Sequence, residues 1–148
     1  MIGTQPNIVQ AILNISGDPN NYPQTNNDIA TRWADVADDL LSQVIPQTTT
    51  QAAARQAFIG VMMAIDPTVP NGLLLLEQAF VAYAAAIAAG MQPTFTGTPP
   101  PAPPPIVATL NTPNDAQTAA NLLATLLCTW AITGTAVNNS SGASSLWA

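Results

Sequence analysis

The chain has 148 residues, of which 48% are hydrophobic and only 7% charged, and its formal net charge is −6. It contains no Lys and no His, and Arg32 and Arg55 are its only cationic side chains. Nucleic-acid affinity through direct phosphate contacts is therefore excluded, and acidic membrane surfaces would repel the chain. A charged fraction this far below the usual value of about 25% is typical of surfaces covered by other subunits, although an ordinary soluble domain rich in Ala and Thr is the alternative.

The usual residues of catalysis and metal binding are missing. Without His, neither a Ser–His nor a Cys–His arrangement can form, and there is no His or Cys cluster for zinc and no phosphate-binding glycine motif. The single Cys128 lies in an apolar segment, so we expect a small buried hydrophobe. The composition thus predicts a protein that is not an enzyme, with no catalytic residues, no cofactor, no metal and no small-molecule substrate.

Four helices are predicted before the proline-rich segment, at about residues 6–15, 28–45, 49–65 and 72–89. In the second, apolar side chains recur at period 3.6 from Ile29 to Val44, and Pro46 ends the helix. Threonines 48–50 offer caps for the third, where Gly60 costs about 1 kcal/mol against Ala unless a neighbouring backbone needs the room. The fourth is apolar nearly all round, which predicts the central helix of the core.

Three carboxylates share the polar face of the second helix. Asp35, Asp38 and Asp39 lie opposite the apolar stripe, so we expect solvated groups with ordinary pKa values rather than an acid–base pair. A calcium site there would lack the loop oxygens that such sites favour. Arg32 precedes Asp35 by three residues, which predicts an ion pair along the helix.

Residues 72–89 also approach the length of a membrane-spanning helix. However, Glu77 and Gln78 lie inside this stretch, and no Lys or Arg flanks it to set a topology. We therefore expect a core helix, and a membrane-inserting, holin-like lysis protein is an alternative.

A proline-rich segment over residues 92–112 divides the chain. Each proline fixes φ near −65° and keeps the preceding residue out of the α region, so residues 98–105 predict a polyproline II rod of roughly 25 Å. Two interpretations stay open: an exposed linker, or a strap docked on the protein itself or on a partner. For the strap we expect contacts with neighbouring subunits at Phe95, Pro99, Pro100, Pro101, Pro103, Pro104, Pro105 and Ile106.

One more helix is predicted after the proline-rich segment. Residues 106–110 are a short β-branched run that we expect to be extended. Thr112 as a cap, Pro113 at the first position and Asp115 in the first turn then predict a helix over 113–134. This helix packs back on the first group or onto a neighbour.

The end of the chain, residues 135–148, is polar except near its last residues. It is predicted to be an extended tail in which Leu146 and Trp147 form an anchor that docks on a neighbouring subunit. A frayed end is the alternative.

Two segments carry a resemblance to known proteins. The stretch Pro93-Thr-Phe-Thr-Gly-Thr-Pro-Pro-Pro101 and the run Trp130-Ala-Ile-Thr-Gly-Thr-Ala-Val-Asn-Asn139, which leads to Trp147, resemble parts of small virion proteins of tailed bacteriophages. The resemblance implies a structural component of the head, neck, tail or baseplate. Such a component is located in the virion, is assembled in the host cytoplasm, and has copies of itself and other virion proteins as partners.

These patterns together predict an all-α domain. We expect a small bundle of four to five helices with a helical core over residues 1–91, a polyproline II strap before the last helix and an extended C-terminal tail. The function hypothesis is a non-enzymatic assembly protein that works as repeated copies. The alternatives are the holin-like membrane protein and a small soluble helical regulator or chaperone that binds one partner.

Overall fold

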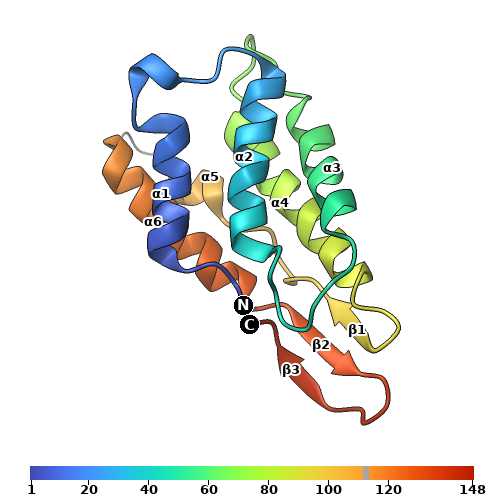
Figure 1. The fold of residues 1–148 in the computed structure, drawn as a ribbon. Helices are drawn as coiled ribbons and strands as arrows, with labels where there is room; N and C mark the ends of the chain where they lie inside the picture. Colours follow the sequence, from blue (N-terminus) through green and yellow to red (C-terminus); the bar gives the residue numbers. More distant parts are fainter. Residues whose placement is uncertain (112–113) are drawn as a thin grey trace.

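The computed structural model describes residues 1–111 and 114–148, which form a helical body with a small sheet at one end (Figure 1). The chain is mostly helical, as predicted, but a three-stranded antiparallel sheet shows that the all-α prediction is wrong in that part. The described elements, in order, are α1 (Gln5–Ser16), the 3-10 helix η1 (Pro19–Asn21), α2 (Asn26–Leu41), α3 (Gln51–Met62), α4 (Gly72–Ala89), β1 (Phe95–Thr98), α5 (Ile106–Thr109), α6 (Ala116–Ala131), β2 (Thr135–Asn138) and β3 (Ser144–Leu146).

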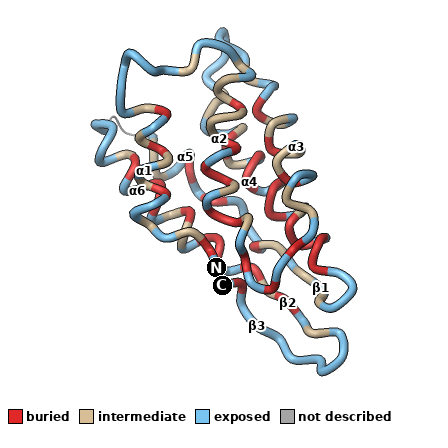
Figure 2. The backbone as a smooth tube through the Cα atoms, viewed as in Figure 1, coloured by how far each residue is buried: buried red, intermediate tan, exposed pale blue. Residues whose placement is uncertain are grey.

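The long helices form the body in two pairs joined by α2. α3 packs most extensively on α4, α1 packs on α6 of the same chain, and α2 contacts all four of them. Buried residues run along the inward faces of these helices, whereas the β2–β3 hairpin is largely exposed (Figure 2). Edge-to-face contacts from Phe80 to Phe58 and to Trp130, with ring centroids 5.2 and 6.1 Å apart, connect α4 to α3 and to α6.

The predicted extended tail is a β-hairpin. β2 lies at the centre of the sheet, antiparallel to both β1 and β3. The Asn138 side chain accepts hydrogen bonds from the backbone N–H groups of Ser140 and Ser141 at 2.9 and 3.1 Å, and Gly142 takes the left-handed φ of 73° that the turn requires. Polar turn residues therefore make the hairpin where we expected an extended tail.

The first part of the predicted strap is strand β1. Phe95 lies opposite Asn138 in β2, and Gly97 lies against the end of α4. A Cβ at Gly97 would be 2.7 Å from the Ala88 carbonyl oxygen, so the close approach of strand and helix requires glycine.

Trp147 is buried in its own chain, where it holds β3 against β2. Its side chain is 2% exposed, and its indole Nε1 donates a hydrogen bond to the Thr135 carbonyl oxygen at 2.9 Å. Its backbone N–H donates to the Gly134 carbonyl oxygen at 2.8 Å. A Cβ at Gly134 would lie 2.4 Å from the Trp147 ring, so the indole packs directly on the glycine backbone.

The last residue of the chain also pairs with the loop after α2. Ala148 and Ile45 exchange two backbone hydrogen bonds, of 2.7 and 3.1 Å. The N–H of Ile45 is therefore bonded to Ala148 instead of a helical carbonyl. α2 ends at Leu41, where the pattern predicted residue 45, so the segment after it is free to pair with the C-terminal residue.

The proline-rich segment contacts α6 of the same chain. The indole Nε1 of Trp130 donates to the Ala102 carbonyl oxygen at 2.7 Å, and Pro100 and Pro104 are buried. Ile106, at the end of the segment, is fully buried in the core. Of the two open interpretations, docking on the chain itself is the one that these contacts favour.

The backbone of this segment is not one straight rod. It bends at Pro101 and Ala102, and Pro105 has a ψ of 60°, far from the value of about 145° of polyproline II. The conformation of the other prolines stays a prediction. The run 106–110, expected to be extended, instead forms the helical turn α5, because the Pro105 carbonyl oxygen accepts the Thr109 N–H at 3.1 Å.

The last helix begins later than predicted. α6 starts at Ala116, and its N-cap is Asp115, whose carboxylate accepts the Thr118 N–H at 2.8 Å. The expected cap Thr112 and the expected first residue Pro113 lie outside the described residues. The Asp115 carboxylate is the hydrogen-bond acceptor for a backbone N–H group of the first turn, so the helix can begin at Ala116.

Three successive threonines close the end of α4 rather than the start of α3. Thr48 Oγ1 donates to the Ile87 carbonyl oxygen at 2.8 Å, and Thr50 Oγ1 donates to the Ala86 carbonyl oxygen at 2.6 Å. These carbonyls belong to the last turn of a helix, where backbone partners run out. α3 accordingly begins at Gln51 without a side-chain cap.

We expect Gly90→Ala to lower the free energy of unfolding by about 1–3 kcal/mol, as overpacked sites do. The new Cβ would lie 2.1 Å from both Thr48 Oγ1 and Thr50 Oγ1. The matched control is Gly60→Ala in α3, whose Cβ would meet nothing within 4 Å and which should gain about 0.5–1 kcal/mol. Urea unfolding followed by circular dichroism measures both, and a Gly90→Ala chain as stable as wild type would contradict the packing.

Candidate interaction site

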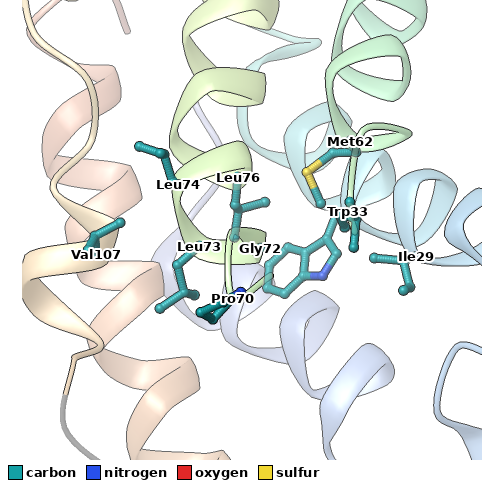
Figure 3. A pocket seen from close by; sticks show the side chains of 10 residues that line it. Ile29, Trp33, Met62, Pro70, Gly72, Leu73, Leu74, Leu76 and Val107 are labelled. Carbon is teal, nitrogen blue, oxygen red and sulfur yellow. The ribbon is translucent and has the colours of Figure 1, made fainter. Parts of the chain in front are cut away.

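An apolar groove opens at the N-terminal end of α4 (Figure 3). Its volume is about 630 Å³. Side chains of α2 and α3 lie on one side of it, and side chains of α4 and α5 lie on the other. Its main lining residues are Ile29, Trp33, Met62, Leu73, Leu74 and Val107.

The groove exists because four consecutive leucines follow Gly72, the first residue of α4. Successive helical residues are about 100° apart, so four neighbours cannot all face one core. Leu76 is buried at 3% exposure, whereas Leu73 and Leu74 remain 38% and 49% exposed. The first turn of α4 thus presents apolar surface that no other element of the described chain covers.

Trp33 adds a hydrogen-bond donor to this apolar surface. The indole N–H groups of Trp130 and Trp147 donate to backbone carbonyls. In the part of the chain that the structure describes, the Trp33 indole N–H has no such acceptor, and the ring lies along the groove. A half-buried tryptophan usually pairs its N–H, so this group is available to an occupant that brings an acceptor.

Carboxylates lie at the border of the groove. Glu77 Oε1 accepts the backbone N–H of Val107 at 2.7 Å and so holds α5 beside α4. Asp66 follows the lining residue Ile65 and accepts hydrogen bonds from the hydroxyl and the backbone N–H of Thr68 at 2.7 and 2.8 Å, which lowers the pKa of Asp66. Two carboxylates therefore lie next to lining residues, and Arg32, which precedes the lining residue Trp33, is paired with Asp28.

A second polar cluster links α2, α3 and α4. The Tyr83 hydroxyl donates to Asp38 Oδ1 at 2.7 Å, and Arg55 of α3 bonds to Asp38 and pairs with Asp35 at 2.9 Å. Arg32 pairs with Asp28 at 3.0 Å, so the predicted Arg32–Asp35 pair is wrong. The carboxylates of α2 are partners for α3 and α4 rather than a purely solvated face.

Of the three carboxylates of α2, Asp39 departs from the ordinary pKa that we expected. Burial, followed by the carboxylates of Asp35 and Asp38, raises the pKa of Asp39. Burial, followed by the hydrogen bond to Asp38, raises the pKa of Tyr83 well above its usual range. Among residues 1–111 and 114–148, no group of His, Cys, Asp and Glu is arranged to hold a metal ion. The cluster acts as a structural link between helices.

The predicted contact residues do not gather in one site. Ile106, Trp147, Pro100 and Pro104 are buried within the chain, and Phe95 is half-buried in the sheet. Pro99 is half-buried as well. The residues that remain exposed are Pro101, Pro103, Pro105 and Leu146, the last at 62%.

Sequence reasoning missed the groove. It assigned Trp33 to the apolar stripe of its helix and Leu73 and Leu74 to a central helix. The available signal was the leucine run itself, because a helix that is apolar on every side needs cover on every side.

Comparisons of the chain with protein-family models, with curated proteins and with solved structures found no match. Among the described residues, α4 is the one helix long and apolar enough to cross a membrane by length and composition, and 44% of that stretch is buried inside the fold. A core helix passes the same test. The polar contacts of Glu77 and Tyr83 fit such a helix.

Tyr83→Phe tests the link between the helices and its pH dependence. Because the pKa of Tyr83 is raised on folding, the unfolded chain loses this proton first as pH rises above about 10, and folding stability falls there. Burial also raises the pKa of the half-buried Cys128 thiol, which acts in the same direction. We expect the free energy of unfolding of wild type to fall over this alkaline range, and to fall less steeply for Tyr83→Phe.

At neutral pH the same substitution should cost about 1 kcal/mol, because Asp38 loses a hydrogen-bond donor. Tyr22→Phe is the matched control, since Tyr22 is 45% exposed. Urea titrations at several pH values measure these free energies. Equal alkaline slopes for wild type and Tyr83→Phe would contradict the assignment.

Proposed function

We propose that the chain is a non-enzymatic assembly protein that works as repeated copies in a particle and holds neighbouring protein chains. The observation that carries the proposal is the open apolar groove of about 630 Å³ on a chain with only 7% charged residues. Contiguous exposed apolar surface marks sites of protein interaction. Low surface charge is typical of subunits that cover one another.

The resemblance to small virion proteins of tailed phages supports a virion as the particle. The two segments that carry it, residues 93–101 and 130–139, are far apart in the sequence but contain the paired strands β1 and β2. They therefore form one local structure in the fold. A shared structural unit is a better basis for the proposal than two separate stretches.

Contacts between copies are proposed at the proline-rich segment and the C-terminal strand, through the residues that remain exposed there. Leu146 is 62% exposed in β3, whose three residues are all exposed at one edge of the sheet. Pro101, Pro103 and Pro105 are exposed as well. Trp147 supports this surface from inside its own chain, since it is buried there.

A small helical regulator or chaperone with one partner is the second candidate. The groove supports it too, because an apolar site of about 630 Å³ can hold side chains of a single bound segment. The two candidates differ in the mass of the purified chain, because a regulator of this kind stays small at every concentration.

Light scattering after size-exclusion chromatography tests the proposal in buffer without detergent. We expect the measured mass to rise with concentration above the 15.3 kDa of one chain. Leu146→Gln should shift this rise to roughly tenfold higher concentration, because burial of a Leu side chain contributes about 1.5–3 kcal/mol. Leu122→Gln on α6, at a position that is 40% exposed, is the matched control and should leave the rise unchanged.

A mass of one chain at every concentration would contradict repeated copies and favour the regulator. Recovery of the protein only in detergent would favour the holin-like alternative. Equal effects of Leu146→Gln and Leu122→Gln would place the contact elsewhere than at β3.

A further inference from the structure

The groove at the N-terminal end of α4 is apolar inside, and two carboxylates lie next to its lining residues. We infer that it binds an amphipathic helix of another protein, with apolar side chains on one face and Lys or Arg beside them. The inference rests on the proposed function and names the partner of this site. Three observations carry it: the shape of the apolar surface, the charge around it and the free donor of Trp33.

The shape of the groove suits a helix. Ile29, Trp33 and Met62 lie on one side of the first turn of α4, and Leu74 and Val107 lie on the other (Figure 3). The groove that they line has a volume of about 630 Å³. A helix that enters such a groove presents apolar side chains three and four residues apart. Exposed leucines on a first helical turn are typical contacts for such side chains.

The charge around the groove selects a cationic partner. Asp66 follows the lining residue Ile65, and Glu77 accepts the backbone N–H of the lining residue Val107. Hydrogen bonds from Thr68 lower the pKa of Asp66. Arg32 is the cationic residue next to the lining residue Trp33 in the sequence. It is paired with Asp28 and donates a hydrogen bond to the Asn21 carbonyl oxygen. Lys or Arg side chains flanking an apolar helical face would therefore meet carboxylates.

A second copy of the chain does not supply this chemistry. The chain has no Lys, and its two Arg side chains are already in ion pairs with Asp28, Asp35 and Asp38. Contacts between copies are therefore better placed at the sheet end of the molecule, and the groove is left for a different chain.

The Trp33 indole N–H fits the end of a bound helix. The last four carbonyl groups of any helix lack intrahelical donors. One of them can accept the Trp33 N–H, which has no acceptor among the described residues. The donor would then fix how far the helix enters the groove.

Isothermal titration with two synthetic helical peptides tests the inference. The peptides share one leucine face and carry either Lys or Glu at every polar position. We expect the Lys peptide to bind one to one and at least about tenfold more tightly than the Glu peptide. The double variant Asp66→Asn, Glu77→Gln should reduce that ratio, and the side-chain amide oxygen introduced by Glu77→Gln can still accept the Val107 N–H.

The matched pair Leu74→Gln and Leu122→Gln separates the groove from general adsorption to an acidic chain. The two positions are 49% and 40% exposed, so both chains should fold, which circular dichroism checks. Leu74→Gln should weaken binding of the Lys peptide about tenfold, and Leu122→Gln should not. Undiminished binding to Leu74→Gln, or equal affinities for the two peptides, would overturn the inference.

Light scattering on the same variants distinguishes this inference from the proposed function. Loss of self-association in Leu74→Gln would show that a second copy occupies the groove and would overturn the inference. Peptide binding to a chain that never self-associates would uphold the inference and contradict only the repeated copies.

Discussion

The helix α4 is apolar around its circumference, and the other elements lie where they can cover it. α3 and α2 pack on it, β1 approaches its C-terminal end at Gly97, and α5 is held beside it by Glu77. Removal of apolar surface from water is the main favourable term in folding, so this arrangement follows from the composition of one helix. The cover ends at Leu73 and Leu74, and the groove lies there.

Polar side chains fix the position of the elements that pack on α4. The Thr48 and Thr50 hydroxyls donate to carbonyls in the last turn of α4. In the middle of α4, Tyr83 donates to Asp38, which also accepts a hydrogen bond from Arg55. Each such bond contributes modestly to the free energy of folding, and together they tie α2, α3 and the loop before α3 to α4. Both arginines of the chain are in ion pairs, Arg32 with Asp28 and Arg55 with Asp35 and Asp38, so the remaining charge is negative.

The helices could be predicted from the sequence because their signals are local. Residues 72–89 form α4 with the predicted bounds, since a continuous apolar run marks them. The sheet could not be predicted, because its strands have only four, four and three residues and β1 pairs with a strand beyond the whole of α6. The groove was hidden for a related reason: periodicity marks the apolar face of Trp33 or Leu74 but does not show which neighbour covers it.

The two ends of the chain are held at one end of α2. Gly3 donates to the Leu40 carbonyl oxygen and Ala148 pairs with Ile45, whereas Ile29 in the groove belongs to the first turn of the same helix. With 16 residues, α2 separates the two regions by about 24 Å. A tether or a fluorophore attached at either end would therefore leave the groove facing outward.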